Sequence, residues 1–172
     1  MPEACIALGG NLGPVLHTFC RALRRMTAFC EPLALSAAYH TTALVQPGMV
    51  APPYWNAVVV VHCRLVPRAL LGRLLALETR AGRRRSRRWA ARPLDLDLLL
   101  YDGCTMHTRQ LTLPHPRLRQ RSFVLLPLCD VRPQLAVGPD GLTAQASLQR
   151  LPAASAGILA RRTNWYAPGR LC

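Results

Sequence analysis

Two aspartates interrupt an otherwise apolar stretch near the middle of the chain. Asp95 and Asp97 lie between residues 92 and 101, a segment whose branched apolar residues and length are typical of one buried strand. Because side chains alternate along a strand, both carboxylates should face one space about 6.5 to 7 Å apart, while the leucines at even positions from 94 to 100 point the opposite way. Like charges this close repel each other unless a cation lies between them, and carboxylate oxygens favour magnesium or calcium. The pair therefore predicts a divalent-cation site.

An isolated Asp-x-Asp is more often the solvated end of a strand, but the surroundings of this pair favour a functional role. The whole chain has only eight acidic residues. The pair is preceded by a run of arginines, namely Arg83, Arg84, Arg85, Arg87, Arg88 and Arg92. Carboxylates beside guanidinium groups suit a metal-bound polyphosphate. For Arg84 and Arg87 we favour an ordinary solvated surface position.

The charge balance first suggests a nucleic-acid binder, because the net charge is +14 and the pI is about 11.1. However, charged residues make up 17% of the chain, against about 25% in typical domains, so the imbalance is a shortage of acids. All 22 basic residues are arginine, which excludes a P-loop with its lysine. A basic RNA-binding domain that uses the Arg83–Arg92 cluster remains an alternative, although it gives the aspartates no role.

The cysteines and the start of the chain indicate a cytoplasmic protein. The seven cysteines are widely spaced without a Cys-x-x-Cys, so we expect buried free thiols rather than disulfides or a metal site. Glu3 lies where a signal peptide would be basic. No apolar run approaches the roughly 18 residues that a membrane span requires. We therefore expect no membrane segment.

Strand and helix patterns alternate through the first two thirds of the chain. Apolar residues at helical spacing predict one helix over 14–29 and another from Pro67, with Leu70, Leu71, Leu74, Leu75 and Leu77 facing the core. Strands are expected over 5–8, 33–40 and, most clearly, 54–63. Glycines follow the first of these strands, and a long irregular loop over 41–53 precedes the third.

The signals become weaker towards the C-terminus. Residues 148–159 could form a broken helix, and residues 161–172 are expected to be a poorly ordered tail, which leaves a single domain over residues 1–160. Because strands and helices are interleaved, we expect an α+β sandwich with a mainly antiparallel central sheet and helices on its faces.

Five blocks in order resemble one family, the hydroxymethyl-dihydropterin pyrophosphokinases of folate biosynthesis. The blocks are Gly9-Gly10-Asn11-Leu12-Gly13, Tyr54-x-Asn56, Glu78-x-x-x-Gly82-Arg83-x-Arg85, Arg88-Trp89-x-x-Arg92-x-Leu94-Asp95-Leu96-Asp97, and Pro114-His115-Pro116-Arg117 with Arg121-x-Phe123-Val124-Leu125-x-Pro127-Leu128. Each block is weak alone, but their order and spacing from about Cys5 to Pro133 are specific. The resemblance implies a ferredoxin-like α/β sandwich.

The resemblance also implies a reaction. The β,γ-pyrophosphoryl group of ATP would pass to the hydroxymethyl group of 6-hydroxymethyl-7,8-dihydropterin and leave AMP. Two magnesium ions held by Asp95 and Asp97 would bridge the triphosphate, and Arg83, Arg85 and Arg92 would be catalytic. The partners would be ATP and the pterin, without nucleic acid or membrane, and the chain is expected to act as a monomer. A fold relative that has lost catalysis is a further alternative.

The resemblance assigns binding residues at both ends of the site. ATP would be bound by Arg92, Thr112, His115, Arg117 and Arg121. A flat heterocycle needs an aromatic sandwich and an amide that both donates and accepts, which Tyr54, Phe123 and Asn56 could supply. Gly9, Thr42, Ala43, Leu44 and Trp89 complete the implied pterin set, and Glu78 would support the arginine loop through an ion pair.

The chain departs from the family pattern at several positions. Ala90-Ala91 replaces the usual Gly-Pro after the tryptophan, Pro93 takes a position often held by threonine, and Thr42-Ala43 stands where prolines are common. These departures concern loop geometry and rates more than the reaction itself.

Overall fold

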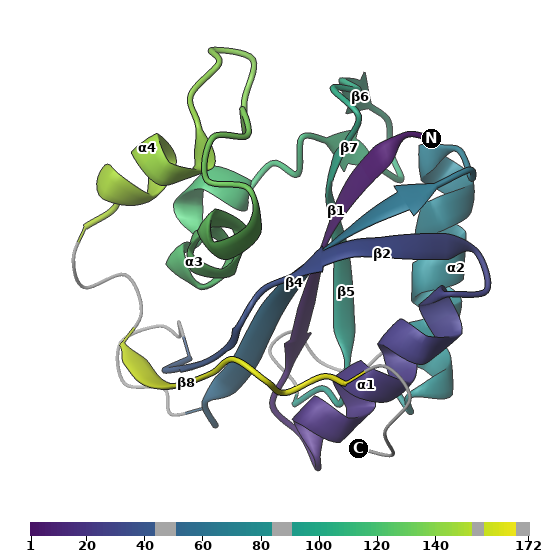
Figure 1. Cartoon of the computed structure of the whole chain (residues 1–172), viewed down its shortest axis with the longest axis vertical. Helices are drawn as coiled ribbons and strands as arrows, with labels where there is room; N and C mark the ends of the chain where they lie inside the picture. The colour runs from purple at the N-terminus through teal and green to yellow at the C-terminus, as the bar shows by residue number, and fades with distance from the viewer. Residues whose placement is uncertain (44–50, 84–90, 153–156, 168–172) are drawn as a thin grey trace.

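A computed structural model describes residues 1–43, 51–83, 91–152 and 157–167 (Figure 1). The elements in chain order are β1 (Glu3–Gly10), α1 (Val15–Met26), β2 (Cys30–Leu35), β3 (Ala38–Thr41), β4 (Tyr54–Cys63), α2 (Pro67–Arg80), β5 (Asp95–Tyr101), β6 (Met106–His107), β7 (Thr112–Leu113), the 3-10 helix η1 (Leu118–Gln120), α3 (Ser122–Val131), α4 (Ala144–Gln149) and β8 (Ile158–Arg162).

The central sheet is antiparallel at every described pairing. Its order is β5-β1-β4-β3-β8, and β2 also pairs with β4. The long strand β4 contains four consecutive valines, whose branched side chains favour a strand buried on both faces. The predicted α+β class with a mainly antiparallel sheet is confirmed.

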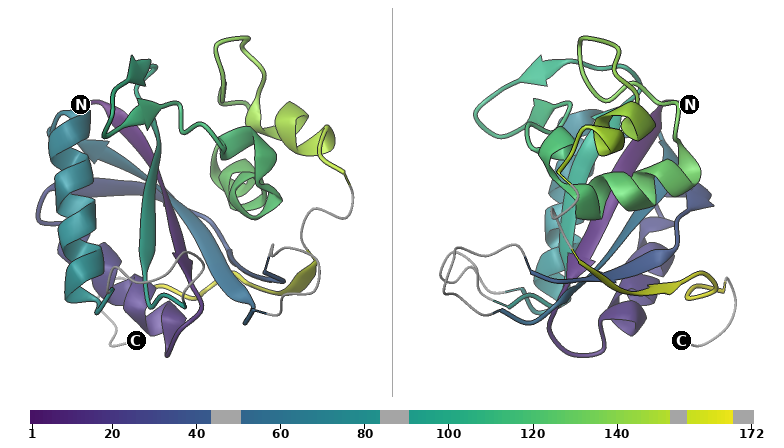
Figure 2. Two further views of the ribbon diagram at one scale, coloured as in Figure 1. Left: turned by 180° about the vertical axis from the view of Figure 1, so that it is seen from behind. Right: turned by 90° about the vertical axis from the view of Figure 1, so that its left-hand side faces the viewer.

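Two cores lie on opposite faces of the sheet, beneath the two pairs of helices that flank it in Figure 2. On one face, α1 and α2 bury the apolar residues that recur at helical spacing, among them Phe19, Leu23, Leu70 and Leu74. On the other face, α3 and α4 pack against Val58 and neighbouring residues of the sheet. The two predicted amphipathic helices are thus both present, and α2 begins at Pro67, a favoured first helical residue.

The strand expected over 33–40 is two strands in the structure. β2 and β3 are separated by Ser36 and Ala37 and pair with different parts of β4. The Ser36 hydroxyl accepts a hydrogen bond from the Val58 N–H at 2.9 Å, while the Ser36 N–H donates to the Val58 carbonyl at 3.0 Å. A buried serine side chain therefore replaces a backbone partner and lets the chain change direction between the strands.

The C-terminal segment is ordered further than the sequence suggested. Of the broken helix expected over 148–159, residues 153–156 lie outside the described residues, while α4 ends at Gln149 and β8 begins at Ile158. The expected tail boundary at residue 161 falls inside β8. Beyond it, the Trp165 indole N–H donates to the Ser36 carbonyl at 2.9 Å, and the ring packs edge-on against Phe19. Partners distant in the sequence thus hold residues up to Trp165.

No helix in the described part of the chain is long and apolar enough to cross a membrane. Cys5, Cys30 and Cys63 are buried free thiols, and the buried Cys20 Sγ donates to the Trp165 carbonyl at 3.4 Å.

Candidate active site

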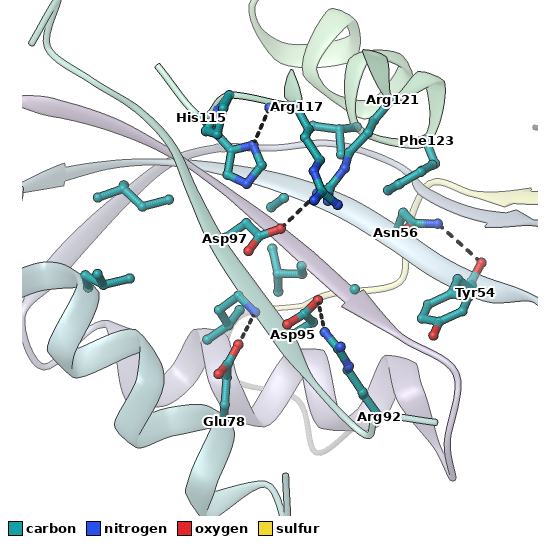
Figure 3. A pocket seen from close by; sticks show the side chains of 18 of the residues that line it. Tyr54, Asn56, Glu78, Arg92, Asp95, Asp97, His115, Arg117, Arg121 and Phe123 are labelled. Atoms are coloured by element: carbon teal, nitrogen blue, oxygen red, sulfur yellow. Dashed lines mark hydrogen bonds and ion pairs between the residues drawn. The ribbon is translucent and has the colours of Figure 1, made fainter. Parts of the chain in front are cut away.

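Asp95 and Asp97 begin β5, and both side chains point into a pocket on the sheet face that α3 borders (Figure 3). On the opposite face, Leu94, Leu96 and Leu98 are buried in the core with α1 and α2. The alternation expected from the sequence therefore holds from Leu94 to Leu98, and the two carboxylates share one space.

A β-bulge ends this alternation. Cys5 of β1 pairs with Leu100, but Ile6 pairs with Leu98, so Leu99 is an extra residue in β5. Leu100 consequently packs with the core under α3, and Tyr101 enters the core under α1 and α2. The expectation that Leu100 faces the same way as Leu98 is wrong, because one inserted residue moves every later side chain to the other face.

Three arginines from separate segments contact the two carboxylates. Arg83 Nη1 lies 2.6 Å from Asp95 Oδ1, and Arg92 Nη1 lies 3.0 Å from Asp95 Oδ2. Arg121 Nη1 lies 3.2 Å from Asp97 Oδ2. Charge-assisted contacts of this kind are stronger than neutral hydrogen bonds. Positive and negative groups therefore alternate across the floor of the pocket.

Asn11 fixes the backbone that leads into the aspartates. Its Oδ1 accepts from the Arg92 N–H at 2.8 Å, and its own N–H donates to the Arg92 carbonyl at 2.9 Å. The glycine-rich turn is thereby tied to the start of β5. The sequence contained Asn11 in a recognised block but gave no indication of this partner.

Glu78 is a buried carboxylate beneath the site. Its side chain is 3% exposed, and its Oε1 accepts from the Leu96 N–H at 2.7 Å. The same oxygen forms an ion pair with Arg83, which in turn contacts Asp95. Because Leu96 lies between the two aspartates, Glu78 holds the part of the strand that carries them. The expected ion pairing of Glu78 is present, with a second contact that the sequence did not predict.

The buried position of Glu78 should make stability depend on pH. Its pKa is raised from 4.5 to about 7, mainly by burial and also by Asp95, against the opposing effects of the Leu96 N–H and Arg83. Between these pKa values the folded protein binds a proton that the unfolded chain has released, so the contribution of Glu78 to the free energy of unfolding falls as pH rises. Relative to the wild type, the free energy of unfolding of Glu78→Gln, which stays neutral, should therefore rise by about 1 to 2 kcal/mol between pH 4.5 and 7.

Urea unfolding of both proteins at several pH values in this range measures that gain. A difference in the free energy of unfolding that stays constant with pH would contradict the raised pKa of Glu78.

The opposite end of the pocket is lined by an amide between aromatic residues. Asn56 of β4 is buried, and its Nδ2 donates to the Thr41 hydroxyl at 3.0 Å and to the Tyr54 carbonyl at 3.4 Å. Both amide hydrogens are thus engaged, which leaves Oδ1 as an acceptor. Thr41 was not predicted, because its contact with Asn56 depends on how β3 pairs with β4.

Phe123 lies in the first turn of α3, with the Arg121 guanidinium carbon 5.7 Å from its ring centre. Burial raises the pKa of Tyr54, so its hydroxyl stays protonated at neutral pH. An uncharged phenol ring and a phenyl ring therefore reach the same pocket from β4 and α3.

His115 is held as a neutral imidazole. Its backbone N–H donates to the Leu99 carbonyl at 2.8 Å, and its Nδ1 accepts from the Arg117 N–H at 3.2 Å. Burial lowers the pKa of His115 against the opposing effect of Asp97. With Nδ1 acting as an acceptor, the ring proton is on Nε2, where it can be donated. The Thr112 hydroxyl lies 3.3 Å from His107 Nδ1.

One pocket of about 760 Å³ brings the predicted residues together. Those that line it are Gly9, Thr42, Ala43, Tyr54, Asn56, Glu78, Arg83, Arg92, Asp95, Asp97, Thr112, His115, Arg117, Arg121 and Phe123. Leu44, Arg85 and Trp89 lie outside the described residues. The pocket has room for a drug-sized ligand or larger.

The pocket also contains residues that sequence reasoning missed or placed elsewhere. Leu71 packs against the core as expected and also lines the pocket, whereas Leu75, expected to face the core, is 40% exposed and lines the pocket. Arg109 and Gln110 join them from the segment before β7. Helical spacing shows that these leucines lie on an apolar face of α2, but it does not show that this face extends beyond the edge of the sheet.

Comparison with known proteins gives one consistent family. The model of the family described as 7,8-dihydro-6-hydroxymethylpterin-pyrophosphokinase matches residues 5–133. A 2-amino-4-hydroxy-6-hydroxymethyldihydropteridine pyrophosphokinase from Synechocystis is 39% identical over 148 residues, which cover 83% of this chain and 74% of the relative. The enzyme of the same name from Methylorubrum extorquens is 34% identical, with 88% of this chain and 94% of the relative covered.

Solved structures support the fold. A crystal structure of a Plasmodium falciparum HPPK-DHPS triple mutant aligns with a TM-score of 0.69 at 14% identity. The alignment covers 86% of this chain but only 43% of the Plasmodium chain. The ferredoxin-like sandwich expected from the sequence therefore agrees with the architecture of this neighbour.

Proposed function

The chain belongs to the 7,8-dihydro-6-hydroxymethylpterin-pyrophosphokinase family, and on this premise we propose that its reaction takes place in the pocket described above. The enzyme transfers the β,γ-pyrophosphoryl group of ATP to 6-hydroxymethyl-7,8-dihydropterin and yields AMP and the dihydropterin pyrophosphate. The observation that carries this placement is the convergence of two aspartates and three arginines in one pocket that also contains an amide and two aromatic rings.

Asp95 and Asp97 are a donor set that fits magnesium. Within the described ranges, no group of three or more His, Cys, Asp or Glu side chains could hold a metal ion by itself. The chain thus offers hard carboxylate oxygens at two residues and leaves other positions to phosphate oxygens and water, which is how Mg²⁺ is usually bound beside a nucleotide. We assign two Mg²⁺ ions to this pair, and when bound they would neutralise charge on the triphosphate.

The arginines would neutralise the remaining charge. Phosphoryl transfer passes through a loose transition state that requires positioning and electrostatic stabilisation more than covalent chemistry. Arg83 and Arg92 approach Asp95 from two directions, so a phosphate beside Asp95 would meet donors on both sides. Arg121 and the Nε2 proton of His115 would serve the phosphates beside Asp97, while Arg117 and Thr112 extend this side of the pocket.

Tyr54, Asn56 and Phe123 would bind the pterin. The two rings would enclose the flat heterocycle. Asn56 donates to Thr41 through Nδ2, so its Oδ1 would accept a hydrogen bond from the N–H edge of the pterin. Gly9, Thr42 and Ala43 would complete the wall.

The identity of the nucleotide product tests the proposal. Incubation of the protein with ATP, Mg²⁺ and 6-hydroxymethyl-7,8-dihydropterin should release AMP and no ADP, because the β,γ-pyrophosphoryl group moves intact. Chromatography of the nucleotides measures this directly. Release of ADP would contradict pyrophosphoryl transfer.

Measurements of ligand binding and of RNA binding separate the alternatives. Binding of ATP and pterin without AMP release would indicate a fold relative that has lost catalysis. Tight RNA binding with a steep salt dependence and no magnesium requirement would favour the basic RNA-binding domain.

A further inference from the structure

Thr42 and Gly157 are joined by two reciprocal hydrogen bonds. The Thr42 N–H donates to the Gly157 carbonyl at 2.9 Å, and the Gly157 N–H donates to the Thr42 hydroxyl at 3.0 Å. These two bonds, which we call the Thr42–Gly157 clasp, continue the pairing of β3 with β8 beyond Thr41 and Ile158. Segments more than a hundred residues apart in the sequence thus lie side by side at this edge of the sheet (Figure 1).

The clasp acts on the backbone that forms the pterin end of the pocket. Thr41, Thr42 and Ala43 all line the pocket, and the Thr41 hydroxyl orients the amide of Asn56. Thr42 follows the last residue of β3, so the pairing of β3 with β4 no longer restrains it. If the Thr42 N–H had no hydrogen-bond partner, the φ angle of Thr42 could vary. The clasp supplies that partner from the C-terminal segment.

β8 is itself anchored, so it can act as a fixed support. Arg161 Nε donates to the Tyr39 hydroxyl at 3.0 Å, and Arg161 Nη2 lies 3.3 Å from Asp130 Oδ1. The Asp130 carboxylate also accepts from the Tyr39 hydroxyl at 2.8 Å and from the Ala37 N–H at 3.1 Å. This network connects β8, β3 and α3, the helix that begins with Phe123 in its first turn.

We propose that Gly157 is a positioning residue for pterin binding, which acts by holding Thr42 and Ala43 in the conformation that forms the pocket wall. The inference rests on the proposed function, because it takes the occupant of this part of the pocket to be the pterin. It gives the C-terminal segment, which lies outside the matched residues 5–133, a role in substrate affinity.

A matched pair of substitutions at residue 157 tests the proposal. Gly157→Pro removes the N–H that donates to Thr42, whereas Gly157→Ala keeps it. An added Cβ would meet the Thr42 side chain at 3.4 Å, an ordinary contact distance. We expect Gly157→Pro to weaken pterin binding about three- to tenfold, as expected for loss of one net hydrogen bond, with ATP binding unchanged. Gly157→Ala should bind pterin more tightly than Gly157→Pro does, because it keeps the N–H that donates to Thr42.

Because proline could itself alter the backbone around residue 157, a second pair of substitutions tests the proposal without proline. Arg161→Ala removes the contacts that support β8. Arg162→Ala, on the same strand, is its control, because the Arg162 side chain has no hydrogen bond or ion pair with the described residues. Arg161→Ala should weaken pterin binding in the same direction as Gly157→Pro, and Arg162→Ala should not.

Amide hydrogen exchange at Thr42 without ligands gives a readout that needs no substrate. Faster exchange in Gly157→Pro together with weaker pterin binding would support the proposal. Faster exchange with unchanged pterin binding, or an equal loss of ATP and pterin affinity, would overturn it. If the wild type bound no pterin at all, the proposed function itself would fail, whereas normal wild-type binding with unaffected variants would reject only the role of Gly157.

Discussion

Asp97→Ala should lower kcat by about a thousandfold or more while leaving the protein folded. The side chain is 35% exposed and contacts Arg121 at 3.2 Å, so alanine removes no core packing. What it removes is one of the two carboxylates assigned to magnesium. A catalytic metal typically stabilises the transition state by several kcal/mol. Loss of about 4 kcal/mol of this stabilisation corresponds to about a thousandfold loss in rate. AMP release under saturating ATP and pterin measures the effect.

Asp140→Ala is the matched control for this substitution. Asp140 is also a partly exposed carboxylate paired with one arginine, Arg119, but it lies outside the pocket. Because exposed ion pairs contribute little, this variant should keep its kcat within about twofold. Near-normal AMP release by Asp97→Ala would show that the metal is held elsewhere, and unfolding of Asp97→Ala would show that the carboxylate has a structural role.

The direction of the two aspartates could be predicted because it depends only on local backbone geometry. Side chains alternate along any strand, so Asp95 and Asp97 had to share a face once the strand was recognised. The bulge at Leu99 could not be predicted in this way. It arises from the pairing of β5 with β1, and pairing between distant strands leaves no local periodic signal.

The residues that sequence reasoning missed depend on long-range register. Thr41 contacts Asn56 because β3 lies beside β4, and Asn11 reaches Arg92 across more than eighty residues of chain. Leu75 has the same helical spacing as the core leucines of α2, and only the position of α2 against the edge of the sheet places it outside the core. Resemblance to a family identified blocks of residues, but not the contacts between the blocks.

The strand β8 could not be predicted for a related reason. β8 is short and exposed along its length, with no alternation of apolar and polar residues. Its order comes from the edge of β3 and from Trp165, which is held by Ser36 and Phe19. A strand that gains its stability from partners rather than from its own buried face has no amphipathic pattern in the sequence.

Gly10→Ala should lower the free energy of unfolding by about 2 to 3 kcal/mol, the upper range for overpacking a well-packed site. A Cβ at this position would lie 2.9 Å from the Pro93 carbonyl oxygen and 2.9 Å from Val15 Cγ1. The carbonyl belongs to the backbone just after Arg92, which Asn11 holds by two hydrogen bonds. The clash therefore cannot be relieved by rotation of a side chain, and urea unfolding should show a lower midpoint.

Gly9→Ala separates this packing effect from the general cost of removing a glycine, since β1 extends through both residues. A Cβ at Gly9 would meet Asp95 Cβ at 3.7 Å and Asn56 Oδ1 at 3.8 Å, which are ordinary contact distances. Its stability should therefore change by less than about 1 kcal/mol. The added methyl group would lie in the pocket, so pterin affinity should fall instead. A larger loss of stability in Gly9→Ala than in Gly10→Ala would contradict this explanation. The requirement for glycine at residue 10 would then not come from the close approach of β1 to the backbone before Asp95.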